Sequence, residues 1–285
     1  MARQVHVLLF TLPTLCAEVV WSSQAGQDKR VAELLPVTKH SRRFFVDLAC
    51  NDPKIISNSY ALEHELGWRG ICIDATDQSR RLFAASGRSC HFVRAIVGDN
   101  PSQSVLFRDI VPSADTPPRY NWTFGLSSAV RDEYVPTCWG KNMASCINVQ
   151  TFQRNNVALV HTRMQVQTLA SILTEAKAPR VIDYLSLDVE GFEDAVLRSP
   201  DLTSYRIRAV TIERPSNYAR TRLAELGLTF LEDLEFDELW IRNSSVVGGY
   251  HNQQLIGQLR KQVTRLDELK REAQSAIVDL GGRVL

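Results

Sequence analysis

Short apolar runs alternate with amphipathic segments through the middle of the chain. The runs at 44–48, 70–74, 91–97, 181–187 and 207–213 each have the length of one buried strand. Segments 77–85, 168–177 and 216–226 carry apolar residues at helical spacing. We expect 103–109 to pair with 157–164, and further strands near 228–231 and 236–242. This order predicts an α/β domain with a mostly parallel sheet and helices on both faces.

The first apolar run leads into a loop of small and acidic residues that ends at Asp52 and Pro53. Asp followed by Pro is typical of a helix N-cap and first turn, so we expect a helix from here to about Leu66. Asp74 ends the second run. A strand-end acid at this distance from the loop either accepts hydrogen bonds from a ribose diol or is a solvated strand end.

The run that begins at Val181 ends in three acids, Asp188, Glu190 and Glu193. In an open α/β sheet this strand lies beside the first, so Asp188 and the loop after the first strand should face one crevice. Glu193 also fits the first turn of a helix. Glu213 closes the next strand and either joins the crevice or pairs with its neighbouring arginine.

Charge and cysteine spacing narrow the class of partner. The 285 residues carry 33 basic and 32 acidic side chains, with no basic block. This charge distribution gives no sign of binding to a nucleic acid or an anionic membrane, so we expect a small-molecule or polar-surface substrate. No cysteine pair has the spacing of a zinc site, and no metal site is predicted. Cys138 and Cys146 are the best-placed disulfide in an oxidising compartment, with reduced thiols as the alternative.

Residues 1–25 predict a secretory signal peptide, followed by a linker at 26–43. Arg3 precedes an apolar run at 5–17, and small residues at 23–25 offer a cleavage site. The run is shorter than the ~20 residues of a membrane span, so no stable span is expected after its removal. Sequons at Asn121 and Asn243 agree with the ER or Golgi lumen or with secretion. The alternatives are an uncleaved anchor or a cytoplasmic protein with a disordered tail.

Two further segments stand apart from the predicted sheet. The irregular stretch 111–156 is long enough to be a lid or a substrate wall, and its aromatic residues either stack on an acceptor or pin the loop to the core. At 250–285, apolar residues recur at heptad spacing. This predicts a C-terminal amphipathic helix that packs on its own domain, or else forms a weak homodimer.

Motifs across residues 44–242 resemble, in order, the FkbM family of S-adenosylmethionine-dependent O-methyltransferases. They are FFVDLACNDP (44–53), SNSYALEHELGWRGICID (57–74), HFVRAIVGD (91–99), GLSSA (125–129), QTLASIL (167–173), DYLSLDVEGFE (183–193) and VTIE (210–213). The resemblance implies a domain at 44–249 with the class I methyltransferase, Rossmann-like fold. Its sheet would have seven strands, one of them antiparallel. The activity implied is methyl transfer from S-adenosylmethionine to a hydroxyl of a sugar, glycan or small metabolite.

The resemblance also implies site residues. Asp188 would be the base that takes the hydroxyl proton or orients the hydroxyl, with Glu190 beside it and Glu213 as a weaker candidate. Those that would contact the cofactor are Asp47, Ala49, Asn51 and Asp52 at its methionine end, Asp74 at its ribose, and Asp188.

The chain departs from the family pattern at three positions. Ala49 and Pro53 replace two glycines, and Asp74 replaces the usual glutamate. Ala49 adds a methyl group where backbone should approach the ligand, and Pro53 removes an amide donor. The alternative function is therefore a non-catalytic FkbM-like binding module of the secretory pathway, since the resemblance extends to animal trafficking proteins of the Star type. The retained acids favour the enzyme.

Overall fold

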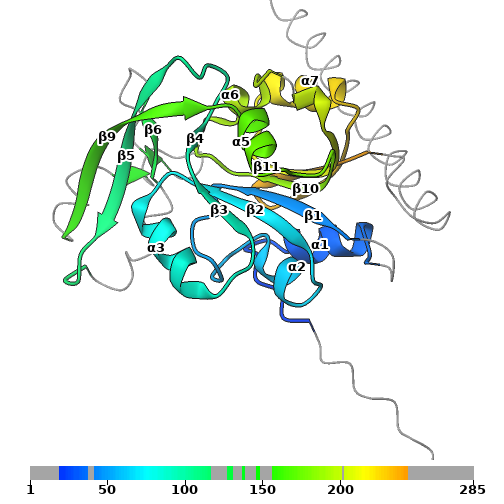
Figure 1. Cartoon of the computed structure of the whole chain (residues 1–285), viewed down its shortest axis with the longest axis horizontal. Coiled ribbons are helices and arrows are strands. Elements are labelled where there is room, and N and C mark those ends of the chain that lie inside the picture. The colour runs from blue at the N-terminus through cyan, green and yellow to red at the C-terminus, as the bar shows by residue number, and fades with distance from the viewer. Residues whose placement is uncertain are drawn as a thin grey trace, which may run out of the picture.

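The computed structural model describes residues 19–37, 42–116, 127–130, 137–138, 146–147, 156–200 and 202–242. These residues are built around a seven-stranded sheet in the order β12-β13-β11-β10-β1-β2-β3 (Figure 1). Its strands are β1 (Phe44–Leu48), β2 (Arg69–Asp74), β3 (His91–Arg94), β10 (Val181–Leu187), β11 (Arg206–Glu213), β12 (Thr229–Leu234) and β13 (Asp237–Ile241). Strand β13 runs antiparallel to both neighbours, and the other pairings are parallel. The predicted fold class is confirmed.

Helices cover both faces of this sheet (Figure 1). On one face lie α5 (Leu169–Glu175), α6 (Glu193–Leu197) and α7 (Asn217–Glu225), and on the other α1 (Gln27–Leu34), α2 (Tyr60–His64) and α3 (Asp77–Ser86). Alternate residues of β1 face opposite cores: Val46 and Leu48 pack on the α5–α7 side, and Phe45 on the other. Gly70 of β2 is required here, because a Cβ at this position would lie 2.4 Å from the Phe45 ring.

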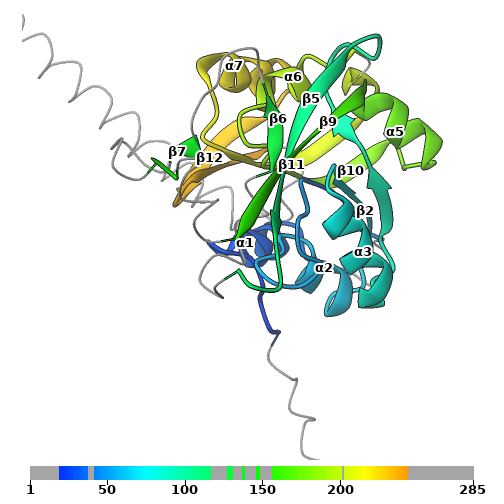
Figure 2. The same cartoon turned by 90° about the vertical axis from the view of Figure 1, so that its left-hand side faces the viewer.

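A second sheet, in the order β4-β9-β5-β6, projects from the first (Figure 1), and its strands β5, β6 and β9 lie nearest the viewer in Figure 2. It contains β4 (Ile96–Val97), β5 (Ser104–Pro112), β6 (Ser128–Val130) and β9 (Val157–Gln167). Strands β5 and β9 pair antiparallel from Ser104–Gln165 to Pro112–Val157, which confirms the expected pairing. Because β4 follows β3 directly, this sheet is held at the carboxyl edge of the main one.

Within the 111–156 stretch the backbone also forms β7 (Thr137–Cys138) and β8 (Cys146–Ile147), in which Cys138 lies opposite Cys146. Residues 117–126, 131–136, 139–145 and 148–155 of that stretch lie outside the described residues. So do the predicted C-terminal helix at 250–285, both sequons and residues 1–18. No helix in the described ranges is long and apolar enough to cross a bilayer.

The predicted linker at 26–43 is corrected by helix α1. Val31 and Leu34 are buried in the core on the α1–α3 side, so the segment belongs to the domain. The residues before α1 are held as well. Asp28, which is fully buried, accepts hydrogen bonds from the backbone amides of Ser22 and Ser23. Ser23 also forms an isolated parallel β-bridge with Ile56. A signal-peptide boundary at residue 25 would therefore cut through ordered structure.

The predicted helix after Asp52 is also corrected. Asp52 accepts hydrogen bonds from the amides of Lys54 and Ile55, both at 2.8 Å, and so closes a tight turn rather than a helix N-terminus. Helix α2 begins only at Tyr60. The Asp side chain does bond nearby amides as expected, but Ile56 takes a left-handed conformation (φ 50°) that a continuing helix does not allow.

Candidate active site

The loop after β1 is shaped by two left-handed residues. Ala49 (φ 61°) and Asn51 (φ 49°) turn the chain so that the amides of Ala49 and Cys50 both donate to the Ile73 carbonyl, at 2.8 and 3.1 Å. An alanine in this region of φ/ψ space costs about 1–2 kcal/mol, whereas glycine carries no such penalty. This explains physically why a glycine is favoured at position 49.

Asp74, at the end of β2, is bonded within its own chain. Its Oδ1 accepts from the amide and hydroxyl of Thr76, both at 2.8 Å, and its Oδ2 accepts from the amide of Asn51 at 3.0 Å. Thr76 in turn caps helix α3 through the Ser79 amide. Burial raises the pKa of Asp74 in spite of these bonds. Asp74 therefore holds the loop after β1 and the start of α3 together, and its replacement would disturb the fold as well as any ligand.

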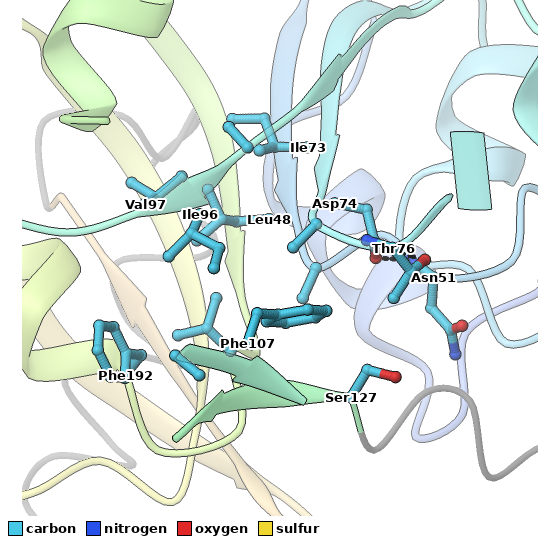
Figure 3. Close-up of a pocket in the computed structure, with 15 residues that line it drawn as sticks. Leu48, Asn51, Ile73, Asp74, Thr76, Ile96, Val97, Phe107, Ser127 and Phe192 are labelled. Carbon is cyan, nitrogen blue, oxygen red and sulfur yellow. Dashed lines mark hydrogen bonds between the residues drawn. The ribbon is translucent and has the colours of Figure 1, made fainter. Parts of the chain in front are cut away.

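An apolar cavity of about 570 Å³, open to solvent, lies over this loop. Asn51, Asp74 and Thr76 gather at one side of it, and Val97 and Phe192 lie across from them (Figure 3). Its other labelled lining residues are Leu48, Ile73, Ile96, Phe107 and Ser127. A flat apolar ring system with a polar ribose fits such a wall, because apolar side chains can enclose the ring while the polar end takes the diol.

A second, polar cavity of about 680 Å³, which includes open solvent, adjoins the first. Ala49 and Asn51 line both cavities, so the two meet at the loop after β1. Its lining contains four carboxylates, Asp47, Asp188, Glu213 and Asp237, together with Gln27 and Asn58. The one crevice expected beside Asp188 and the loop after the first strand is thus two adjoining cavities at one sheet edge. Asp74 lines the apolar cavity, and Asp47 and Asp188 line the polar one.

Asp188, Glu190 and Glu213 lie together at the ends of β10 and β11. Glu213 also pairs with Arg214 at 2.8 Å, so both alternatives for Glu213 hold. One carboxylate oxygen from each lies within 4.8 Å of the other two. Burial and the neighbouring carboxylates of Glu213 and Glu190 raise the pKa of Asp188 well above its ordinary value. Burial, with Glu213 next, raises the pKa of Glu190 to about 7. Glu190 is not among the residues that line either cavity.

The turn that presents these acids is held by Glu193. Its Oε1 accepts from the amides of Val189 and Gly191, both at 3.1 Å, which fixes the turn between β10 and α6. Glu193 therefore has the local role that its place in the first helical turn predicted, and it supports the Asp188 loop at the same time.

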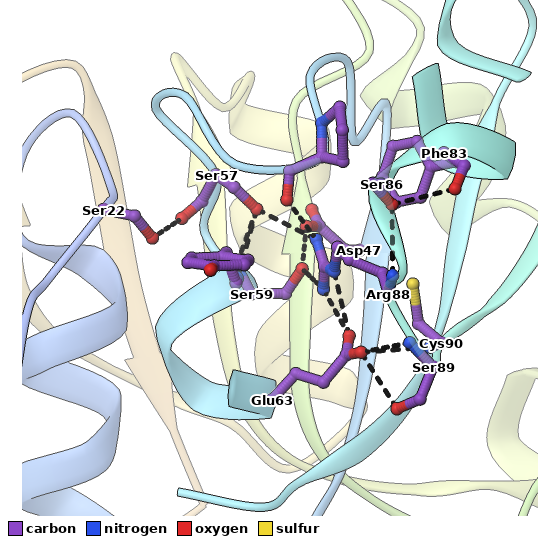
Figure 4. Close-up of polar contacts among 12 residues, drawn as sticks. Ser22, Asp47, Ser57, Ser59, Glu63, Phe83, Ser86, Arg88, Ser89 and Cys90 are labelled. Atoms are coloured by element: carbon purple, nitrogen blue, oxygen red, sulfur yellow. Dashed lines mark hydrogen bonds and ion pairs between the residues drawn. The ribbon is translucent and has the colours of Figure 1, made fainter. Parts of the chain in front are cut away.

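Asp47 is connected to a buried ion pair behind the site (Figure 4). It accepts a hydrogen bond from the Ser59 hydroxyl, and Ser59 also accepts from Nη2 of Arg88 at 3.0 Å. Arg88 binds both Glu63, at 2.7 Å, and the Pro53 carbonyl, at 3.0 Å. Burial raises the pKa of Asp47, and the hydrogen bond from Ser59 opposes this. The network fixes the loop that carries Asn51.

Asp52 does not reach the site. Its carboxylate closes the turn at Lys54 and Ile55, and it lines neither cavity, so the prediction that it contacts a cofactor is not supported by its position. Ala49, Asn51 and Asp74 do line the apolar cavity, as a cofactor-binding role requires.

The match to known proteins agrees with this geometry. The chain fits the model of the methyltransferase FkbM domain over residues 18–238, which is more than half of its length. It belongs to the FkbM methyltransferase family. The FkbM match begins at residue 18, ahead of helix α1, and so includes the predicted linker at 26–43 and residues 18–25 of the predicted signal peptide. No curated protein is significantly similar to the chain.

Several lining residues of this FkbM domain were not predicted from the sequence. Gln27 donates from Nε2 to Asp237 at 2.9 Å, across 210 positions of the chain. Burial raises the pKa of Asp237 to about 6. Phe107 enters the apolar cavity from the second sheet. Gln27 and Asp237 are the first residues of α1 and β13, and Phe107 lies within β5, and none of these places distinguishes them from many other residues in the sequence.

Proposed function

We propose that this FkbM-family protein transfers a methyl group from S-adenosylmethionine to a hydroxyl of a sugar, glycan or small metabolite. The observation that carries the proposal is the junction of an apolar and an acidic cavity at Ala49 and Asn51. A donor with a ring system and a ribose suits the first cavity, and its methyl-bearing end would then face the second. When bound, S-adenosylmethionine supplies an already activated methyl group on a sulfonium.

The residues of the apolar cavity fit this donor. Leu48, Ile73 and Phe107 give an apolar wall, while Asn51 and Asp74 place polar groups at one end. Ala49 leaves less room than glycine would, but its amide already bonds the Ile73 carbonyl and is not needed for a ligand. Pro53 has no amide hydrogen, but its carbonyl accepts a hydrogen bond from Arg88. Pro53 therefore still belongs to the network that holds the loop.

The acidic cavity supports the proposed class of acceptor. Its four carboxylates accept hydrogen bonds and cannot donate when ionised, so they suit a partner rich in hydroxyl donors and repel an anionic one. Asp188 lines the cavity, and burial with the neighbouring acids raises its pKa, so that its ionised form is a stronger base for the proton of a bound hydroxyl than an ordinary carboxylate. The remaining task of the chain is to align that oxygen with the methyl group.

A methyl-transfer assay tests this assignment. Release of S-adenosylhomocysteine would be followed with a panel of monosaccharides, glycosides and short oligosaccharides. Asp188→Asn should lower kcat by about 10²–10⁴-fold, the usual contribution of a general base, with the donor KM little changed. Methyl transfer to amines or carboxylates alone would contradict the acceptor class, and full activity of Asp188→Asn would contradict the role of Asp188.

We also propose that the protein enters the secretory pathway. The apolar run at 5–17 and the sequon at Asn121 support this. Because Ser22 and Ser23 bind Asp28, cleavage upstream of Ser22 would leave the domain intact, whereas cleavage at residue 25 would not.

A further inference from the structure

Three carboxylates from two adjacent strand ends meet beside the acidic cavity. Asp188 and Glu190 follow β10, and Glu213 is the last residue of β11, which pairs with β10. One oxygen of each lies within 4.8 Å of the others. Asp188 and Glu213 also line the cavity itself. The cluster therefore faces the space assigned to the acceptor.

One oxygen of this cluster has no partner among the described residues. Oδ1 of Asp188 exposes less than 1 Å² and accepts no hydrogen bond. Buried polar atoms are nearly always satisfied, because an unsatisfied one keeps the full cost of its desolvation. Glu213, in contrast, is bound by Nη1 of Arg214 at 2.8 Å. The buried oxygen without a partner thus belongs to an acid of the cluster itself.

We propose that Asp188, Glu190 and Glu213 bind a hard divalent cation, of the class of Mg²⁺, Mn²⁺ or Ca²⁺. Carboxylate oxygens are the ligands that these ions prefer, and the cluster offers neither the imidazoles nor the thiolates typical of zinc. A cation would give Oδ1 of Asp188 its partner and offset the repulsion among the three acids. Its remaining coordination positions would face the cavity.

The role of the ion, but not its binding, rests on the proposed function. A hydroxyl that ligates a divalent cation loses its proton more easily and is held in one orientation. In the acidic cavity this would apply to the acceptor oxygen, whose proton would pass to a carboxylate of the cluster or to water.

Titration calorimetry with Mn²⁺ on protein freed of metal by EDTA tests the site. We expect one site per chain, and Asp188→Asn and Glu190→Gln should each weaken binding about tenfold or more. Asp233→Asn is the matched control, because it removes the same charge from an exposed position on β12 and should bind like the wild type. Thermal melting would show that all four proteins are folded.

Two results would overturn the proposal. One is the absence of binding up to about 1 mM Mn²⁺, the weak end of natural Ca²⁺ sites. The other is equal affinity in the wild type and both cluster variants. Titration of S-adenosylmethionine into the same EDTA-treated samples separates this proposal from the proposed function, because donor binding in the apolar cavity does not require the cation.

Discussion

Removal of the Arg88 side chain should lower the free energy of unfolding strongly, because it leaves a buried carboxylate without its partner. The Nε and Nη2 atoms of Arg88 bind Oε2 of Glu63 at 2.9 and 2.7 Å, and its Nη1 donates to the Pro53 carbonyl at 3.0 Å (Figure 4). Only 2% of the Arg88 side chain and 8% of the Glu63 side chain are exposed. Arg88→Met would keep most of the aliphatic volume and remove every one of these bonds.

Breaking one partner of a buried ion pair costs about 3–5 kcal/mol, because the other charge is left without compensation. At about 2–4 °C per kcal/mol for a domain of this size, the melting temperature should fall by about 6–20 °C. Arg81→Met is the control. Arg81 pairs with Asp77 at 2.6 Å, but its side chain is 72% exposed, so its loss should cost less than about 1 kcal/mol.

The pH dependence provides a second check on the same variant. Burial opposes ionisation of Glu63, but Arg88 and the Ser89 amide together lower its pKa below the ordinary 4.5. A lowered folded-state pKa stabilises the protein above pH 4.5, and this stabilisation is lost as the pH falls through the folded-state value. The difference in the free energy of unfolding between the wild type and Arg88→Met, measured with urea, should therefore become smaller at acidic pH. A cost below about 1 kcal/mol at pH 7, or an equal cost for Arg81→Met, would refute the reasoning.

Three further predictions follow from single positions. Burial raises the pKa of Asp237 from 3.8 to about 6, so ionisation of Asp237 lowers the stability of the folded protein as the pH rises from about 4 through 6. Asp237→Asn should therefore be up to about 3 kcal/mol more stable than the wild type at pH 8 and no more stable at pH 4, as measured by urea unfolding. Ala49→Gly should change stability by about 0 to +1 kcal/mol, whereas Ala84→Gly, in the interior of α3, should cost about 1 kcal/mol; equal losses in thermal melts would contradict the left-handed conformation. Expressed in a eukaryotic secretory system, the mature chain should begin upstream of Ser22 and carry glycan at Asn121, and mass spectrometry of an intact, unglycosylated cytosolic product would contradict the export proposal.

The central strands of the sheet were predictable because they are short apolar runs, of which β2 and β11 end in an acid and β10 is followed by one. Phe45, Val46 and Leu48 need only be apolar and alternate to join two cores, so β1 follows from local pattern alone. Pairing of β1 with β10 then follows from fold topology, which is why Asp188 could be placed beside the first loop.

Helix α1 was not predictable in the same way. Its sequence, QDKRVAEL, has few apolar residues, and its stability depends on burying Val31 and Leu34 against distant parts of the domain. The prediction of a helix directly after Asp52 was wrong for a different reason. It relied on a local signal, an Asp side chain that bonds nearby amides, and here those bonds close a turn instead of starting a helix.

The sequence indicated which acidic residues lie at the candidate site, but not the residues that contact them. Asp47, Asp74, Asp188 and Glu213 all reached the expected sheet edge, since the carboxyl ends of parallel strands meet there. The sequence pattern could not show that the Asp74 carboxylate accepts hydrogen bonds from Thr76 and Asn51, because those contacts depend on the conformation of the loop.

Binding of S-adenosylmethionine tests the central claim most directly. Ala75, which lines the apolar cavity, allows the cavity to be filled without removing a side-chain hydrogen bond. Titration calorimetry should show binding to the wild type and to Ala84→Phe, an exposed helix position that serves as the size-matched control. Ala75→Phe should lose about tenfold or more in affinity, a cost of about 1.4 kcal/mol or more. Wild-type protein that binds no donor, or Ala75→Phe that binds as tightly as the wild type, would contradict the account, and the former would favour a non-catalytic binding module.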